Sequence, residues 1–66
     1  MKIVINGKSY ESEENQTVQK MIETYGYDQT SIAVAVNQEF VPRVDYGKKI
    51  VSEGDEIEIV APMQGG

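Results

Sequence analysis

The sequence predicts an α+β fold in which one helix packs on one face of a mixed sheet of four to five strands. Three observations support this fold class. Apolar residues alternate with polar ones near both ends, at residues 1–5 and 56–61, which is typical of half-buried strands. Residues 18–25 have helical periodicity, and residues 32–36 form an uninterrupted run of Ile, Ala and Val. The order strand, strand, helix, strand, short strand, strand places the helix over one sheet face.

Residues 1–11 predict a β-hairpin. Met1, Ile3 and Ile5 share one face of its first strand, because side chains alternate along a strand. Asn6-Gly7 follows, the dipeptide that best tolerates the positive φ values of a two-residue turn. Residues 8–11 return as the second strand, and their mostly polar character indicates a sheet edge.

Residues 17–26 predict a short helix. Thr17 follows the polar loop 13–16 and is a suitable N-cap. Gly26 stands where a left-handed C-terminal cap is expected. A helix of about two to three turns would not hold alone in water, so it must pack on the sheet. Its apolar stripe comes from four residues at i, i+3, i+4 and i+7: Val18, Met21, Ile22 and Tyr25.

The second half of the chain completes the sheet. Residues 32–36 predict an interior strand, 37–39 a turn, and 40–41 a brief strand that Pro42 ends by removing a donor. Residues 43–49 are irregular, with one helical turn near Tyr46. Residues 52–55 turn into the last strand, 56–61, and the helix is expected to cover six inward residues: Ile3, Ile5, Val34, Val36, Ile57 and Ile59.

Length and residue types exclude several classes of function. Sixty-six residues form one domain, predicted at 1–61, followed by a flexible tail at 62–66. A chain of this size buries only about 60% of the surface that its unfolded form exposes, so its core is small. Cys and His are both absent. This absence excludes disulfides, zinc sites built on these ligands, and Ser/His/Asp triads.

Charge limits the partners. The net charge is −5, from six basic and eleven acidic side chains. A protein that neutralises phosphates has the opposite balance, so nucleic acid and anionic membranes are poor candidates, and a basic protein partner fits better. The first residues resemble no signal peptide, and no long apolar span follows, so we expect a cytoplasmic location.

Most internal candidates for chemistry have simpler explanations. Glu13-Glu14 is loop charge, and Glu56 and Glu58 lie on the outward face of a strand, where carboxylates are usually only solvated. The internal glycines occur singly and form no phosphate-binding loop. Lys48-Lys49 is the only adjacent basic pair and fits a solvated loop.

The last five residues, Pro62-Met63-Gln64-Gly65-Gly66, are the strongest candidate site. Average glycine usage makes a terminal Gly-Gly pair a coincidence of about one in two hundred. Glycine has no Cβ, so such a tail can enter a narrow channel, and five residues reach at most about 16–18 Å. We expect Met63, Gln64 and Gly65 to thread into a partner's site and to deliver the carboxylate of Gly66.

That carboxylate needs activation by another protein. It is ionised in the cell and inert to nucleophiles, and transfer of AMP from ATP would make it an acyl electrophile. A sulfur nucleophile could then replace AMP and leave a thiocarboxylate on Gly66. The chain supplies no catalytic group in this scheme and binds no cofactor, and the activating partner consumes the ATP. The chain is therefore expected not to be an enzyme.

The outer face of the sheet is a second candidate. If Ile3, Ile5, Ile57 and Ile59 point inward, then Val4 and Val60 point outward, near Ala33 or Ala35. Such a patch, ringed by Glu56, Glu58 and Lys2, fits a docking surface for the activating enzyme. Ordinary apolar surface is the alternative.

Four stretches carry a family resemblance: IAVAVN at 32–37, FVPR at 40–43, EGDEIEIV at 53–60 and PMQGG at 62–66. In this order they resemble the ThiS family, the sulfur carriers of thiazole formation in thiamin biosynthesis. The resemblance covers essentially the whole chain. It implies a ubiquitin-like β-grasp fold whose first and last strands are central parallel neighbours. It also implies adenylation of Gly66 by a ThiF-like enzyme, conversion to a thiocarboxylate, and sulfur transfer to a ThiG-like thiazole synthase acting on a substrate derived from deoxyxylulose phosphate.

Three alternatives remain at this point. Another β-grasp sulfur carrier, such as the small subunit of molybdopterin synthase, uses the same tail chemistry, although this chain is short for that family. A protein modifier that forms an isopeptide bond would share the activation step. A plain binding module would use the sheet face, and its tail would be incidental.

Overall fold

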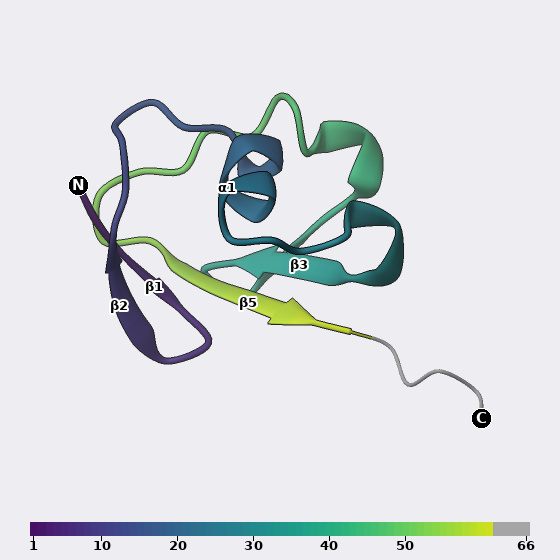
Figure 1. Ribbon diagram of the computed structural model, residues 1–66, viewed down its shortest axis with the longest axis horizontal. Helices are drawn as coiled ribbons and strands as arrows, with labels where there is room; N and C mark the ends of the chain where they lie inside the picture. Colours follow the sequence, from purple (N-terminus) through teal and green to yellow (C-terminus); the bar gives the residue numbers. More distant parts are fainter. Residues whose placement is uncertain (62–66) are drawn as a thin grey trace.

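The computed structural model describes residues 1–61, and the predicted tail at residues 62–66 lies outside this range. Within it the chain forms five strands, one α-helix and two short 3-10 helices. Figure 1 shows α1 lying over one face of the sheet. The bounds in chain order are β1 (Lys2–Ile5), β2 (Lys8–Glu11), α1 (Val18–Thr24), η1 (Gln29–Ser31), β3 (Ala33–Val36), β4 (Glu39–Val41), η2 (Arg43–Asp45) and β5 (Glu56–Val60).

The five strands form one mixed sheet in the order β2-β1-β5-β3-β4. β5 is the central strand, parallel to β1 and antiparallel to β3. The hairpin partners β2 and β4 are the two edges of the sheet. This arrangement confirms the predicted mixed sheet, the interior position of β3, the edge position of β2, and the parallel pairing of the first and last strands.

Both hairpins turn through two residues with positive φ. Asn6 and Gly7 have φ values of 52° and 83°, which confirms the predicted turn. Asn37 and Gln38 have φ values of 52° and 70°. Glu39 already belongs to β4 and pairs with Val36, so the second turn is one residue shorter than predicted.

The caps of α1 confirm the predicted bounds to within one residue. The Thr17 hydroxyl accepts a hydrogen bond of 3.1 Å from the Lys20 N–H. Gly26 has a φ of 83°, and its N–H donates to the carbonyl of Glu23 at 3.2 Å. The Tyr27 N–H donates to the carbonyl of Ile22 at 2.9 Å, which completes a Schellman-type end.

Tyr25 stands at the C-cap of α1 rather than inside the helix, and it is only partly buried. Its ring lies 5.0 Å from that of Tyr10, centroid to centroid, and its hydroxyl donates to the carbonyl of Glu11 at 3.2 Å. The side chain therefore connects the end of the helix to the edge strand β2.

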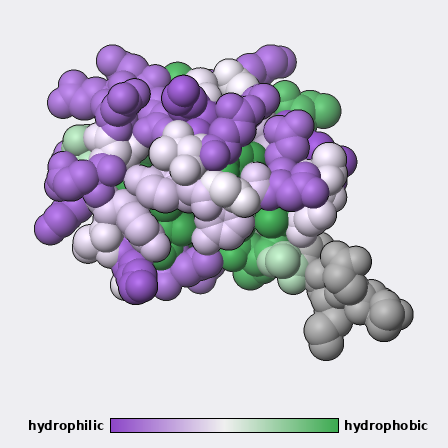
Figure 2. All heavy atoms as spheres, in the orientation of Figure 1, coloured by the Kyte–Doolittle hydropathy of each residue, from purple (hydrophilic) through white to green (hydrophobic). Residues whose placement is uncertain are grey.

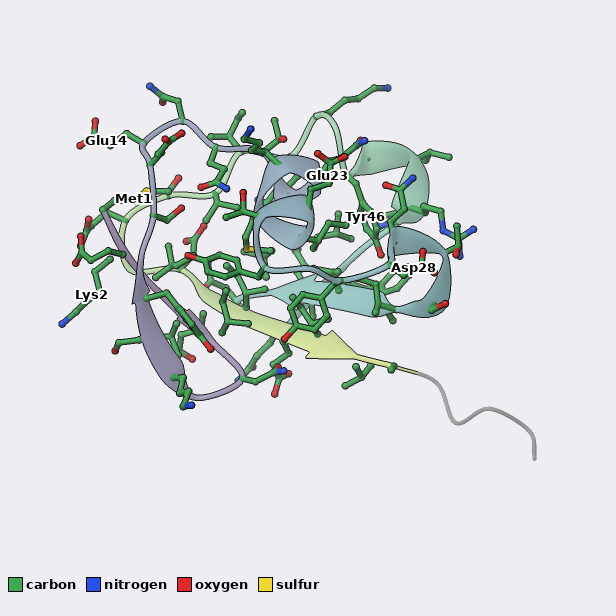
Figure 3. All side chains as sticks on the ribbon, viewed as in Figure 1. Met1, Lys2, Glu14, Glu23, Asp28 and Tyr46 are labelled. Atoms are coloured by element: carbon green, nitrogen blue, oxygen red, sulfur yellow. The ribbon has the colours of Figure 1, made fainter. Side chains whose placement is uncertain are left out.

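All six predicted inward residues of the sheet are buried, together with Val18, Met21 and Ile22 of α1. The core is larger than predicted, because four further residues complete it: Ile32, Val41, Tyr46 and Val51. Tyr46 is only 2% exposed and is the largest of the fully buried side chains (Figure 3).

The segment that carries Tyr46 and Val51 is joined to the start of α1 by backbone hydrogen bonds. The Gln19 N–H donates to the carbonyl of Tyr46 at 2.9 Å, and the Val18 N–H donates to that of Lys49 at 2.9 Å. The predicted helical turn exists as η2, at residues 43–45. A second turn, η1, was not predicted, and it is capped by the Asp28 side chain.

Candidate functional site

Four of the predicted site residues, Met63, Gln64, Gly65 and Gly66, lie outside the described residues. Their proposed role therefore stays a prediction. The described chain ends at Ala61, immediately after β5, so the central strand leads directly into this segment. The part of the candidate site that the structure describes is the surface around β5.

Side chains alternate along β5 between the core and the outer face of the sheet. Ile57 and Ile59 are buried, whereas Glu56, Glu58 and Val60 are exposed. Val60 is 60% exposed and pairs with Ala33 of β3. The predicted outward positions of these residues agree with the structure.

A third strand adds an aromatic residue to this face. Ala35 of β3 pairs with Glu58 on one side and with Phe40 of β4 on the other. The Phe40 side chain is 67% exposed. Because Ala33 and Ala35 have small side chains, the surface forms a depression along β3, between Phe40 and Val60.

These residues line a shallow groove of about 170 Å³, which we call the outer-face groove. Figure 2 shows hydrophobic side chains at the surface near the C-terminal end of β5. Val60, the last residue of β5, belongs to this lining, so the groove reaches the C-terminal end of the strand. Its lining is Ala33, Val34, Ala35, Phe40, Glu58 and Val60.

The residues of the predicted apolar patch lie at two separate places on the outer face of the sheet. Val4 pairs with Glu56, the first residue of β5, whereas Val60 is the last residue of that strand. Four residue steps of about 3.3 Å separate them by about 13 Å along the strand. Val4 and Glu56 line a second hollow, together with Gln38 and Gly7, and Glu58 lines both hollows. The structure thus brings Val60 and Glu58 together with Phe40, and it does not bring Val4 beside Val60.

Sequence reasoning missed Phe40 as a surface residue, although a signal was present. A two-residue turn at Asn37-Gln38 sets the register of β3 against β4, and this register pairs Phe40 with Ala35. Val41 then faces the core with Val34. Assigning the turn to three residues instead of two concealed this alternation.

Hydrogen bonds shift the pKa of one acidic side chain, Asp28. Within residues 1–61, no group of three or more Asp or Glu side chains is arranged to hold a metal ion. The Thr30 hydroxyl and N–H donate to the Asp28 carboxylate at 2.8 and 3.0 Å, and they hold its pKa below the ordinary value of 3.8. Asp28 stands beside η1, away from β5, and acts there as a cap (Figure 3).

No helix among residues 1–61 has the length and apolar character that crossing a membrane requires.

Known proteins share both the sequence pattern and the fold of this chain. The sequence model of the ThiS family matches residues 3–66. The chain is 33% identical over 66 residues to a sulfur carrier protein ThiS of Escherichia coli, and the match covers all of both chains. It is 39% identical over 66 residues to a thiazole synthase of Paramagnetospirillum magneticum, of which it spans only 20% of the length. The crystal structure of a thiamine biosynthesis protein (ThiS) from Geobacter metallireducens superposes with a TM-score of 0.88, at 26% identity and with full coverage of both chains.

One helix on a five-stranded mixed sheet, with parallel first and last strands at its centre, is a β-grasp fold. The family match extends over nearly the whole chain, including the Gly-Gly pair. The chain belongs to the ThiS family.

Proposed function

We propose that the chain is a sulfur carrier of thiamin biosynthesis, and that Gly66 carries the sulfur as a terminal thiocarboxylate. The observation that supports this most directly is the family match, which reaches residue 66 and so includes the tail. The full-length likeness to a sulfur carrier protein of Escherichia coli agrees with it.

The chemistry takes place in two steps. A carboxylate oxygen of Gly66 attacks the α-phosphorus of ATP, pyrophosphate leaves, and an acyl adenylate forms. A sulfur nucleophile such as hydrosulfide then attacks the acyl carbon and expels AMP, and a proton is released. The carrier contributes only the reacting carboxylate, so the catalytic groups belong to its partner, and the carrier itself is not an enzyme. The ATP that this chemistry needs is available in the cytoplasm, where we expect the protein to act.

Two partners follow from this chemistry. A ThiF-like enzyme would bind ATP and adenylate Gly66, and a ThiG-like thiazole synthase would accept the sulfur. The second partner has support from the comparisons, since a thiazole synthase includes a segment 39% identical to this chain. A carrier domain and a synthase in one polypeptide are expected to act together.

The outer-face groove is the surface we propose for docking the activating enzyme. It combines an exposed aromatic side chain with an aliphatic one on either side of two alanines. Exposed aromatic anchors of this kind often dominate binding energy at interfaces. The groove also borders the strand that leads to the tail, so docking there would hold the tail near the partner's active site. Glu56 and Glu58 supply negative charge that can steer a basic partner.

Intact mass measurement tests the carrier function. The protein is incubated with ATP, sulfide and a ThiF-like enzyme, and it should gain the mass difference between sulfur and oxygen. A variant with one residue added after Gly66 should gain nothing, because its carboxylate lies about 3.5 Å farther along the chain. Gly65→Val should also fail, because its Cβ would meet the wall of the channel.

Both variants keep every residue of the described fold, so both should melt like the parent. Thiocarboxylation of the extended protein, without trimming, would contradict the assignment of Gly66 as the reacting residue, and the absence of any mass gain in the parent would favour a binding module with an incidental tail.

A further inference from the structure

Asn6 makes a two-point contact with the end of β5. Its side-chain Nδ2 donates to the carbonyl of Ile59 at 3.1 Å, and the Ile59 N–H donates to its Oδ1 at 2.9 Å. Asn6 and Ile59 are 53 positions apart in the chain. This contact, which we call the Asn6 clamp, lies two residues before Ala61 and is close to the point where the described chain ends.

The clamp extends the parallel ladder between β1 and β5. The backbone N–H groups of Val4 and Asn6 donate to the carbonyls of Asp55 and Ile57, at 3.0 and 2.9 Å. A longer β1 would offer its next carbonyl and N–H to Ile59. The chain turns away at Asn6-Gly7 instead, and the carboxamide of Asn6 takes the place of those missing backbone groups. Without it, the polar groups of Ile59 on this side would have no partner from β1.

Asn37 provides a natural comparison at the opposite end of the same strand. It has the same φ of 52° in the other hairpin turn. The Glu56 N–H donates to its side-chain Oδ1 at 3.0 Å. Two asparagines in equivalent turns thus bind the two ends of β5, and only the Asn6 clamp is adjacent to the reacting tail.

We propose that Asn6 is a positioning residue for the reaction at Gly66, a role that rests on the proposed carrier function. The clamp keeps β5 ordered up to its last residues. Only a short length of chain then separates the domain bound to the partner from the carboxylate of Gly66. If Ile59 were released, the strand would fray from its C-terminal end. The carboxylate would then sample more positions in the partner's site, and small misplacements there reduce rates strongly.

The test compares Asn6→Gly with the matched control Asn37→Gly. Glycine adopts a φ of 52° easily, so each variant removes a side-chain contact without straining its turn. Amide hydrogen exchange should show loss of protection at Ile59 in Asn6→Gly. Asn37→Gly should lose protection at Glu56 and keep it at Ile59.

Steady-state adenylation by the ThiF-like enzyme then measures the consequence. We expect kcat/KM to fall about tenfold in Asn6→Gly, mainly through kcat, and to stay within about twofold of the parent in Asn37→Gly. Asn6→Asp keeps the acceptor for the Ile59 N–H but loses the donor, so its rate should change in the same direction. Asn6→Asp also serves as the test variant if Asn6→Gly does not fold.

The outcomes separate the two proposals. A parent protein that is not adenylated contradicts the carrier function itself. A parent that reacts, while its Asn6 and Asn37 variants lose rate equally, overturns the positioning role alone, because the loss then follows stability. Unchanged exchange at Ile59 in Asn6→Gly would overturn it as well.

Discussion

The two faces of the sheet differ most clearly along β5, where consecutive residues alternate between them. On the inner face Ile57 and Ile59 are at most 5% exposed and pack under α1. On the outer face Val60 is 60% exposed and lines a groove with Phe40. A single strand therefore contributes to folding through one face and is available for recognition through the other. Changes on the two faces should separate stability from partner binding.

The largest effect is expected from the inner face. Ile57→Ala removes buried methyl groups from a small core and should lower the free energy of unfolding by about 2–5 kcal/mol. Urea denaturation measures this loss, and Ile5→Ala, on the neighbouring strand, should behave similarly. If both variants unfold at the parent's urea concentration, the two faces do not differ in the way the structure shows.

The outer face should give the opposite result. Val60→Asp puts a charge into the outer-face groove, so affinity for the activating enzyme should fall about tenfold while the melting temperature stays unchanged. Phe40→Ser should act in the same way. Titration calorimetry or surface plasmon resonance measures the affinity.

Val44 serves as the control for these two variants. It is 81% exposed on η2 and does not line the outer-face groove. Val44→Asp should therefore leave affinity unchanged. Equal losses in all three variants would indicate a general charge or hydrophobicity effect and would contradict a specific groove.

A third change acts on neither face. Gln38 has a φ of 70° in the turn between β3 and β4, a conformation that glycine adopts at lower cost. Gln38→Gly makes this turn Asn-Gly, like the turn between β1 and β2, and should stabilise the protein by about 0.5–1 kcal/mol. Thermal unfolding monitored by circular dichroism measures it. A destabilised variant would show that the Gln38 side chain contributes contacts that outweigh the strain.

The smallest effect is expected at Asp28, which is also off the sheet. Its pKa is lowered because the Thr30 hydroxyl and N–H bind the charged carboxylate. A lowered pKa in the folded state means that the charged group stabilises the protein above pH 3.8, and that this contribution is lost as the pH falls through the lower folded value. Asp28→Asn should therefore melt slightly below the parent at pH 7, and the difference should shrink as the pH falls below about 3.8 and disappear once it is below the lowered folded pKa. A difference that persists in acid would assign it to another cause.

Much of the fold could be predicted because its signals are local. Alternation identified Ile57 and Ile59 as inward and Val60 as outward, and Thr17 and Gly26 marked the ends of the helix. Tyr46 could not be assigned to the core in this way. It follows a short 3-10 turn without periodicity, and it joins a core of residues from the sheet and α1 that are far away in sequence.

The candidate site also has parts that local signals predicted and parts that depended on strand register. The tail from Met63 to Gly66 was identified from residue types alone and lies outside the described residues, so its role stays a prediction. Placing Phe40 in the groove required the register of β3 against β4. Separating Val4 from Val60 required the register of β1 against β5.

By itself, the sequence determined which side chains of β1, β3 and β5 share a face, where the first hairpin turn and the helix ends fall, and which family the chain resembles. The faces, the turn and the helix ends follow from patterns within a few residues, because backbone geometry couples near neighbours directly, whereas the resemblance rests on four stretches in order along the chain. Only the tertiary structure decided the full strand order, the place of Phe40 and Val60 in one groove, and the contact of Asn6 with Ile59. These join segments that are distant in the chain, and their pairing is selected by packing one sheet against one helix, which local patterns do not encode.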